Sequence, residues 1–370
     1  MPVQHLHWSK ALELRDKEKR HLRVPLKGVD FVSNDYLGMA RNEQFAQRLC
    51  GIALKRPNML LGATGSRLIS GNSIAITDAE DRISEWHGVE SSLLFPSGYK
   101  ANLALFSCIA SRGDNILVDA CIHRSVHDGC ALSLATKWKF RHNDLDHLED
   151  LLKKVKGQAF IAVESLYSMD GDYAPLEDIM ALAQRYGAYV IVDEAHAIGV
   201  FGLGLVHKKG LQDQVLATLV TYGKAFGLQG AAWLGGRLLK DFLVNFASPF
   251  IYSTGMSDMQ ACSIQEAYLF LKNNAHLRDQ LQTNISYFRK AEVHTISMED
   301  SPIQVVQFSR ETMLERVLVE SKARGLDLYP IYAPTVPKGS ERLRVCIHAF
   351  NQLHEIHNLL QVIKKYKNEF

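Results

Sequence analysis

The sequence lacks the cysteine patterns that build zinc sites and disulfide frameworks. Its six cysteines are scattered along 370 residues, with no CxxC pair and no cysteine–histidine cluster at zinc-ligand spacing. It also lacks any run near the ~18 apolar residues that a membrane-spanning helix needs. The formal net charge is only +2, which gives no general attraction to nucleic acid or to membrane surfaces. We therefore expect no metal, no nucleic-acid partner and no membrane partner.

The first twenty residues, MPVQHLHWSKALELRDKEKR, have no apolar core of the kind found in secretory signals. Together with the scattered cysteines, which are typical of reduced thiols, this predicts a cytoplasmic protein.

Two nucleotide-binding signatures are missing as well. The run DEAH at residues 193–196 also occurs in helicase motors, but such motors need a phosphate loop of the form GxxxxGK[ST], and the chain has none. A nicotinamide dehydrogenase would need GxGxxG directly after an early strand, and that string is not found there. The sequence therefore favours neither a helicase nor a dehydrogenase.

What the chain does contain is a series of short apolar runs separated by helical stretches. The runs are rich in Val, Ile, Leu or Ala and mostly end in polar residues; they lie at Ser92–Phe95, Asn115–Val118, Ala159–Val163, Ala188–Val192 and Leu216–Thr221. This alternation predicts a mostly parallel sheet with helices on both faces. Ligands of such sheets bind at the carboxyl ends of the strands, where Ser168, Asp193, His196 and Lys224 fall.

Lys224 and Asp193 together indicate a cofactor. Lys224 lies between two glycines and follows an apolar strand, where an amine can hold an aldehyde as a Schiff base. Asp193 leaves the neighbouring strand, where its carboxylate could keep a pyridine nitrogen protonated. Either residue alone is better explained as a solvated turn lysine or an acidic helix cap. Together with the segments around them, they favour a pyridoxal-phosphate enzyme.

Other motifs have structural explanations that the sequence alone leaves open. The run FPSGYKAN follows a strand and begins a helix, so it could bind a phosphate or could be an ordinary turn. His123 could lie against a cofactor ring or be structural. Arg344 could clamp a substrate carboxylate, but Arg342 and Arg344 could equally be surface residues of one strand face.

The length suggests more than one structural unit. We expect an amino-terminal helix and strand segment over residues 1–37, a large cofactor-binding domain over 38–265 and a small α+β domain over 266–370.

In order along the chain, NDYLG, GATGSRLISG, FPSGYKAN, HND, YSMDGDYAPL, VDEAHAIGVFG, TYGKAFG, FIYST and APTVPKGSERLR resemble motifs of the α-oxoamine synthases. The resemblance to this fold-type I pyridoxal-phosphate family covers nearly the whole chain. It implies an α/β fold with a mostly parallel seven-stranded sheet, a small α+β carboxyl-terminal domain, pyridoxal 5'-phosphate as cofactor and acyltransferase activity.

The resemblance also implies roles for individual residues. Lys224 would carry the cofactor and remove the substrate's α-proton, Asp193 would pair with the pyridine nitrogen, His196 would bind the ring's phenolic oxygen and His123 would stack on the ring. These four are the expected catalytic residues. Ser168 would line the same pocket.

The cofactor phosphate would bind backbone amides of Gly98 and Tyr99 and the hydroxyl of Thr221. Thr254 would reach the phosphate of the other subunit's cofactor, which implies a homodimer with a shared active site. For the amino-acid substrate, Arg344 would hold the carboxylate and Asn34 would lie nearby. An amino-terminal arginine, Arg20 or Arg23, would complete the set.

Within the family, GSRLISG, GKAFG followed by GAA, and PTVPKGSERLR are most similar to members that join L-alanine to a pimeloyl thioester in biotin biosynthesis. The pimeloyl carrier would be CoA or an acyl carrier protein. The alternative is a sister synthase that uses glycine and acetyl-CoA, or one like serine palmitoyltransferase. The chain departs from the family pattern at Ile76, Ser257, Asp258, Cys346 and His348, so its acyl-chain preference could differ from that of the family.

Overall fold

The computed structural model describes residues 6–17, 27–333, 335–337 and 339–367. The chain forms two compact units. Unit 1 contains the described residues within 1–33, 169–171 and 281–370, and unit 2 contains residues 34–168 and 172–280. The expected division at residues 37 and 265 stays a prediction. Within the described residues, no helix combines the length and the apolar character that crossing a membrane requires.

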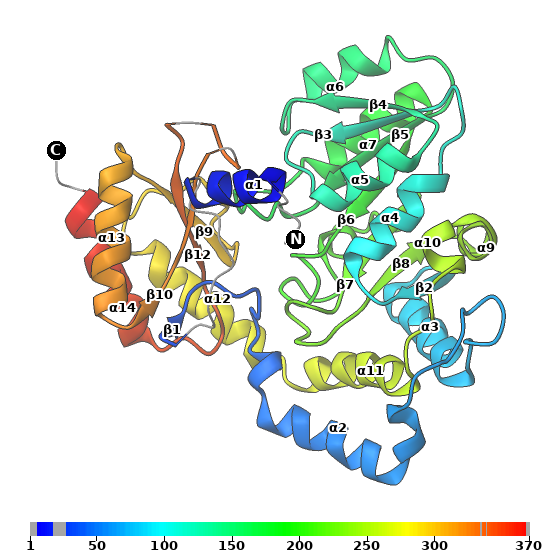
Figure 1. Ribbon diagram of the computed structural model, residues 1–370, viewed down its shortest axis with the longest axis horizontal. Coiled ribbons are helices and arrows are strands. Elements are labelled where there is room, and N and C mark those ends of the chain that lie inside the picture. The colour runs from blue at the N-terminus through cyan, green and yellow to red at the C-terminus, as the bar shows by residue number, and fades with distance from the viewer. Residues whose placement is uncertain (1–5, 18–26, 334, 338, 368–370) are drawn as a thin grey trace. The chain divides into compact units, whose positions relative to one another are not determined.

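Unit 2 is built on a seven-stranded sheet with the order β2-β8-β7-β6-β5-β3-β4 (Figure 1). In that order the strands are Ser91–Phe95, Ala231–Gly235, Ala217–Thr221, Tyr189–Asp193, Ala159–Glu164, Asn115–Asp119 and Thr136–Phe140. The pairs β4/β3, β3/β5, β5/β6 and β6/β7 are parallel, and β8 runs antiparallel to both β7 and β2. The expected mostly parallel sheet of a fold-type I transferase is confirmed.

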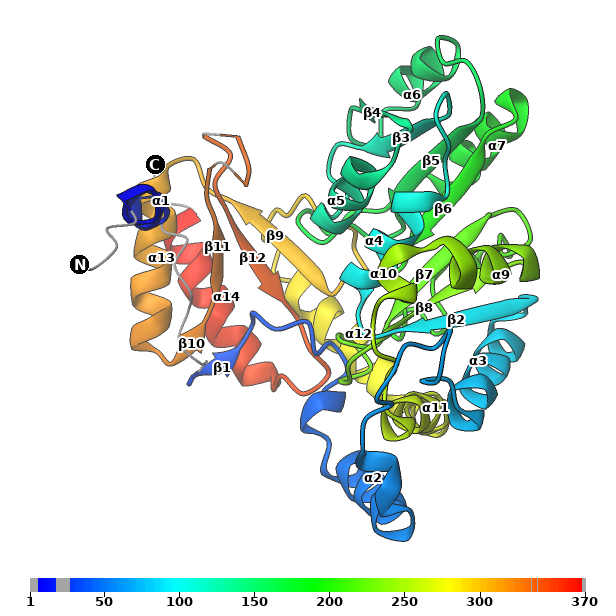
Figure 2. The same ribbon diagram turned by 45° about the vertical axis from the view of Figure 1, so that its right-hand side comes forward.

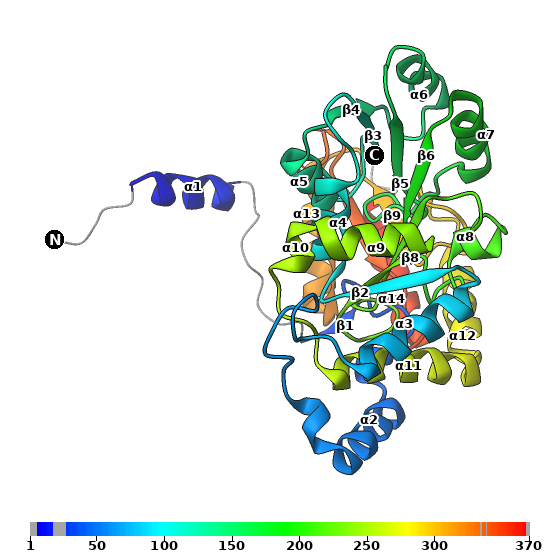
Figure 3. The ribbon, with the colours of Figure 1, turned by 90° about the vertical axis from the view of Figure 1, so that its right-hand side faces the viewer.

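Helices cover both faces of this sheet, because alternate strand residues point to opposite sides. Ile116 and Val118 of β3 belong to the apolar cluster under α4 (Gly98–Cys108), α5 (Arg124–Leu132) and α9 (Arg237–Phe246). Leu117, between them, belongs to the cluster under α6 (Leu145–Leu152) and α7 (Leu176–Tyr186). Figure 3 shows α4 and α5 on one side of the sheet and α6 and α7 on the other.

The remaining helices of unit 2 are shorter or lie beside the sheet. They are η1 (Met39–Arg41), α2 (Glu43–Lys55), η2 (Pro57–Leu60), α3 (Ile74–His87), α8 (Leu205–Lys208), α10 (Ser248–Ile251) and α11 (Asp258–Asn273); α12 (His276–Arg289) begins in unit 2 and ends in unit 1. The helical stretch from Met259 into the 280s is divided into α11 and α12.

Unit 1 contains a three-stranded antiparallel sheet with the order β11-β12-β9 and a two-stranded parallel pair, β1 with β10 (Figure 2). These strands are Tyr329–Ile331, Arg342–Cys346, Ile303–Gln307, Val29–Asp30 and Leu326–Asp327. The helices are α1 (Leu6–Lys17), α13 (Glu311–Ala323) and α14 (Leu353–Lys367), of which α13 and α14 pack together. This unit has the small α+β character expected for the carboxyl-terminal part.

Candidate active site

A cavity of about 270 Å³ lies in unit 2 at the carboxyl ends of β5, β6 and β7. Seven residues expected at the site line it: Gly98, Tyr99, His123, Asp193, His196, Thr221 and Lys224. It therefore brings together side chains from three strand ends and two helix starts that lie more than a hundred residues apart in the sequence. The position agrees with the general rule for ligands of parallel sheets.

The start of α4 forms one wall of this cavity and suits an anion. Ser97 caps the helix by accepting a hydrogen bond from the backbone N–H of Lys100 at 3.3 Å. The following N–H groups and the helix dipole attract negative charge at this end. A side chain at Gly98 would place its Cβ 2.6 Å from the Thr221 methyl group, so only glycine lets the helix start approach β7 this closely.

Asp193 is a buried carboxylate held at both oxygens. Its Oδ2 accepts a hydrogen bond from the amide of Asn102 at 2.9 Å, and its Oδ1 accepts one from the backbone N–H of Ala195 at 2.9 Å. Asn102 also donates to the Ser125 hydroxyl at 2.9 Å, and Ser125 lies 2.8 Å from Nδ1 of His123. Asp193 and His123 are thus parts of one hydrogen-bonded group.

His196 is oriented by a tyrosine. The Tyr36 hydroxyl lies 2.7 Å from Nδ1 of His196, and the same hydroxyl donates to Oδ1 of Asn34 at 3.1 Å. Asn34, expected near the substrate, is therefore linked to the cavity through Tyr36, although it does not line the cavity itself.

The charges around the cavity set the protonation of His123. Burial lowers the pKa of His123; the nearby Asp193 carboxylate opposes that shift, and the positive charge of Lys224 adds to it. The ring is thus favoured in its neutral form, which can lie against an aromatic ring without the cost of a buried cation.

Glu164 is a cavity residue that the sequence did not reveal. Its side chain is buried at the end of β5. In the sheet, Glu164 pairs in register with Asp193 of β6. Burial, reinforced by the negative charge of Asp193, raises the pKa of Glu164 to about 8. Its Oε1 atom is buried without a hydrogen-bond partner among the described residues, while Oε2 accepts a hydrogen bond from the backbone N–H of Ser168 at 3.3 Å. Asn102 was not singled out either, although it is the last residue of the run FPSGYKAN.

The other expected residues lie elsewhere. Ser168 is buried beside Glu164 but does not line the cavity, and Thr254 forms an isolated β-bridge with Ser66. In unit 1, Arg342 and Arg344 are buried on β12, so the alternative that they are surface residues is wrong. Arg344 donates to the sulfur of Cys346 at 2.8 Å, and Arg342 pairs with Asp170. Arg20 and Arg23 lie outside the described residues.

The positions that depart from the family pattern have structural contacts. Ser257 caps α11, and Asp258 accepts a hydrogen bond from the Ser73 hydroxyl at 2.5 Å. Ile76 is buried in α3. In unit 1, Nε2 of His348 lies 2.9 Å from the carbonyl oxygen of Ser33.

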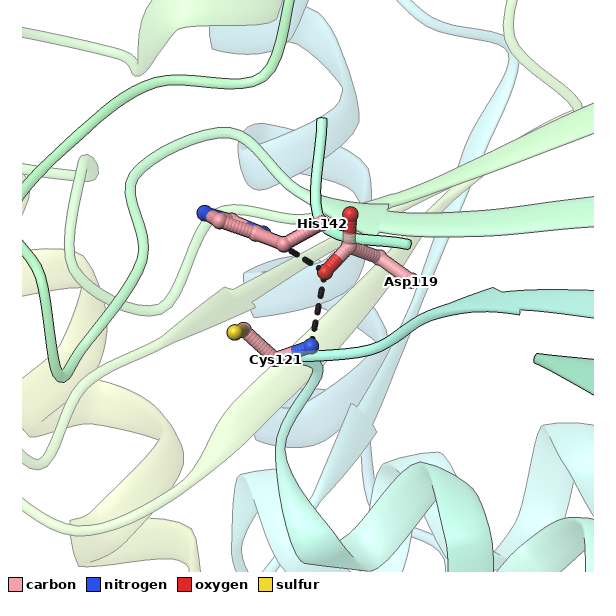
Figure 4. Close-up of side chains that lie close together, drawn as sticks. All are labelled: Asp119, Cys121 and His142. Carbon is pink, nitrogen blue, oxygen red and sulfur yellow. Dashed lines mark hydrogen bonds and ion pairs between the residues drawn. The ribbon is translucent and has the colours of Figure 1, made fainter. Parts of the chain in front are cut away.

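A second group of titratable side chains lies at the ends of β3 and β4, and Figure 4 shows three of its members, Asp119, Cys121 and His142. Nδ1 of His142 lies 2.8 Å from Asp119, and Nε2 lies 2.8 Å from Asp172. Burial lowers the pKa of His142, but the hydrogen bonds to the two carboxylates outweigh it and raise the pKa to about 12. With both ring nitrogens bound to carboxylates, neither offers a lone pair to a metal ion.

Comparison with known proteins supports the same family. The family model described as aminotransferase class I and II matches residues 27–363. An 8-amino-7-oxononanoate synthase of Emericella nidulans is 36% identical, over 95% of this chain and 93% of the fungal protein. Among solved structures, the 8-amino-7-oxononanoate synthase of Francisella tularensis is 25% identical with a TM-score of 0.78, covering 92% of this chain and 97% of that one.

The serine palmitoyltransferase of Sphingomonas wittichii has a similar fold, with a TM-score of 0.86 at 22% identity over 99% of this chain and 98% of that one. Its identity is too low to indicate more than the fold. The family match and the identity to the fungal synthase go further, and the chain belongs to the aminotransferase class I and II family.

Proposed function

We propose that this protein condenses L-alanine with a pimeloyl thioester, releasing carbon dioxide and the carrier thiol and yielding 8-amino-7-oxononanoate. As a member of its family, the chain is a pyridoxal-phosphate-dependent acyltransferase related to enzymes of biotin biosynthesis. The observation that carries the proposal is the cavity that gathers Lys224, Asp193, His196 and His123.

The cavity residues fit this cofactor. The start of α4 and the Thr221 hydroxyl suit a phosphate, and the held carboxylate of Asp193 suits a protonated ring nitrogen. The buried Glu164 Oε1 and Asn102 Oδ1 have no partner within the described residues, which leaves hydrogen-bonding capacity for a bound group. When bound, pyridoxal phosphate supplies an aldehyde that carries the amino acid and a ring that accepts electrons.

The protein's own groups would then divide the remaining work. Asp193, fixed by Asn102, would keep a proton on the ring nitrogen and so favour electron withdrawal. Lys224 would remove the α-proton of the amino acid with its neutral amine. His196, oriented by Tyr36, would hydrogen-bond the ring oxygen, and His123 in its neutral form would lie against the ring. Arg344 would hold the carboxylate of the amino acid.

The proposal extends to the acyl carrier, the location and oligomeric state of the enzyme, and two further site residues. The acyl carrier would be CoA or an acyl carrier protein, the enzyme would be a cytoplasmic homodimer, and Thr254 would contribute to the partner's cofactor site. Ser168 would support the site through its contact with Glu164.

A substrate screen tests the proposal. The purified, cofactor-loaded protein is incubated with L-alanine, glycine or L-serine, each with pimeloyl-, acetyl- or palmitoyl-CoA, and products are identified by mass. We expect 8-amino-7-oxononanoate from L-alanine and pimeloyl-CoA, with Lys224→Ala as the inactive control. Faster turnover of glycine with acetyl-CoA, or of serine with palmitoyl-CoA, would instead identify a sister synthase. A repeat with pimeloyl acyl carrier protein distinguishes the two carriers.

A further inference from the structure

Lys224 lies in the loop that joins β7 to β8, and the backbone of this loop is closed by its own hydrogen bonds. The N–H of Leu228 donates to the carbonyl oxygen of Tyr222 at 2.8 Å, and the N–H of Gly227 donates to that of Lys224 at 2.9 Å. The N–H of Tyr222 donates to the carbonyl oxygen of Gly230 at 2.9 Å. The position of Lys224 therefore depends on how the whole loop is held against its surroundings.

Two aromatic side chains of the loop pack against one tyrosine of α11, Tyr268. Tyr222 and Phe226 come two residues before and two residues after Lys224, and both are buried. The ring centroid of Tyr268 lies 5.9 Å from that of Tyr222 and 4.8 Å from that of Phe226, both in edge-to-face geometry. The ring centroids of Tyr222 and Phe226 are themselves 5.3 Å apart. Because aromatic pairs have preferred geometries, these three mutual contacts fix the direction of both loop side chains.

Hydrogen bonds hold the same tyrosine. The Tyr268 hydroxyl lies 3.3 Å from the Tyr222 hydroxyl and 2.8 Å from Nε2 of His87, the last residue of α3. Burial lowers the pKa of His87 to about 3, with a further contribution from the positive charge of His207, so the neutral imidazole is favoured. With Nε2 as the acceptor nitrogen of that ring, the hydrogen bonds run from Tyr222 to Tyr268 to His87. Burial also raises the pKa of both tyrosines, so all three groups are uncharged near neutral pH.

This buried group lies outside the cofactor cavity but holds a loop whose lysine lies inside it. Tyr268 does not line the cavity, whereas Lys224 does. Burial has the largest effect on the pKa of His123 and of Glu164, and the positive charge of Lys224 contributes a lowering to both. Because such interactions are reciprocal, a change in the position of the Lys224 amine also changes its own protonation.

We propose that Tyr268 is a positioning residue for Lys224. Its ring and its hydroxyl hold the two aromatic side chains of the loop and thereby fix where the lysine amine lies in the cofactor cavity. The inference rests on the role proposed for Lys224 and does not depend on which amino acid or thioester reacts. A displacement of about 1 Å in a reacting group can lower a rate by roughly 100-fold, so such an anchor bears directly on turnover.

The test is the pH midpoint at which the absorbance of the lysine-bound cofactor changes, recorded on the cofactor-loaded enzyme without substrate. Tyr268→Phe keeps the ring and removes the hydroxyl that Tyr222 and His87 share. We expect the midpoint to shift by at least about 0.5 pH unit and kcat to fall by roughly five- to tenfold, with the amino-acid KM changed less than about twofold. Tyr268→Leu, which also removes the ring, should have a larger effect on the midpoint and on kcat.

Three further variants test the route and the specificity of the effect. In a Tyr222→Phe background, Tyr268→Phe should shift the midpoint by less than about half as much as in the wild type, because the bond between the two hydroxyls is already absent. Tyr186→Phe is the matched control, because its hydroxyl donates to Glu149 at 2.8 Å on α7, away from the lysine loop. Leu148→Ala, at a buried position of α6, is the control for a loss of stability alone. Both controls should keep the wild-type midpoint.

The outcomes separate this inference from the proposed function. If Tyr268→Phe and Tyr268→Leu both keep the wild-type midpoint, Tyr268 does not position Lys224, even when 8-amino-7-oxononanoate is formed. If their shifts are no larger than that of Leu148→Ala, or if the two tyrosine substitutions add fully, the inference is overturned. If the midpoint shifts as expected but no pimeloyl thioester is turned over, the positioning role stands and the proposed substrates are wrong. A wild-type enzyme without lysine-bound absorbance would overturn the role of Lys224 and this inference with it.

Discussion

Two histidines at neighbouring strand ends of unit 2 have pKa values shifted in opposite directions. His142 lies between two carboxylates, which raise its pKa to about 12, so the protonated form of its ring is favoured. His123 is buried near both a carboxylate and Lys224, and its pKa is lowered, so the neutral form of its ring is favoured. Direct hydrogen bonds to carboxylates thus outweigh the effect of burial on a histidine pKa, whereas a carboxylate at longer range, opposed by a lysine, does not.

The surroundings of His142 form a structural region of unit 2, and the surroundings of His123 form a functional one. Side chains around His142 should contribute to the stability of the fold, and those around His123 should contribute to turnover.

The largest expected effect is at Lys224. Lys224→Ala should lower turnover by at least about three orders of magnitude, because both the covalent anchor and the proton acceptor are removed. Steady-state kinetics and loss of the cofactor's lysine-bound absorbance measure it. Lys153→Ala, at an exposed helical ion pair, is the control. Substantial residual turnover would mean that another base acts in the cavity.

The next largest effect is the loss of stability in His142→Gln. The change leaves two buried or half-buried carboxylates facing each other without a cation, so the free energy of unfolding should fall by about 3 kcal/mol. Urea unfolding measures this. Arg124→Gln, which removes an exposed i,i+4 pair with Asp128, should change it by less than about 1 kcal/mol. Equal effects of the two substitutions would show that the His142 cluster is not held by charge.

Asn102→Leu should affect the active site moderately. It removes the amide that holds Asp193 Oδ2 while keeping a side chain of similar size. A lost hydrogen bond to a buried carboxylate of this kind is worth about 1.5 kcal/mol, or roughly tenfold in turnover. Cofactor titration and kcat measure the effect, with Asn245→Ala on the exposed face of α9 as control. Unchanged kcat would mean that the Ala195 N–H alone fixes Asp193.

The smallest effect, taken per pH unit, is a pH dependence of stability whose sign differs between the two histidines. The folded pKa of His142 is raised above 6.5, so its contribution to stability is complete below pH 6.5 and is lost as pH rises toward about 12. The stability difference between wild type and His142→Gln should therefore fall above pH 6.5, by at most about 1.4 kcal/mol per pH unit.

For His123 the folded pKa is lowered, so its contribution is present above pH 6.5 and is lost as pH falls below that value. The stability difference between wild type and His123→Gln should therefore fall in the acid direction. Urea unfolding at several pH values, from mildly acidic to mildly alkaline, measures both. If both stability differences fell in the same pH direction, the assigned pKa shifts would be contradicted.

Much of the fold could be predicted from the sequence, because buried parallel strands are continuous apolar runs. Two strands of the seven-stranded sheet were missed. The β4 strand, TKWKF, lies at the sheet edge and alternates lysines with apolar residues, and only its last residue is buried. The β8 strand, AAWLG, directly follows the lysine loop, and its small residues resemble a continuation of that loop.

The candidate site was predictable where its chemistry follows a motif. Lys224, Asp193 and His196 fall at strand ends, and the cavity brings them together. Glu164 and Asn102 could not be recognised, because their importance comes from contacts across strands and helices: Glu164 faces Asp193 in register, and Asn102 reaches it from α4.

The pairing of β1 with β10 bears on how the chain is made. Gly28, next to β1, bonds to the Asp327 side chain across 299 residues of sequence. At about 5–20 residues per second, a ribosome needs roughly 15–60 seconds to deliver β10 after β1 has emerged. Throughout that interval the first strand has no partner while unit 2 is synthesised, so we expect nascent chains stalled before residue 326 to expose β1 to chaperones and proteases.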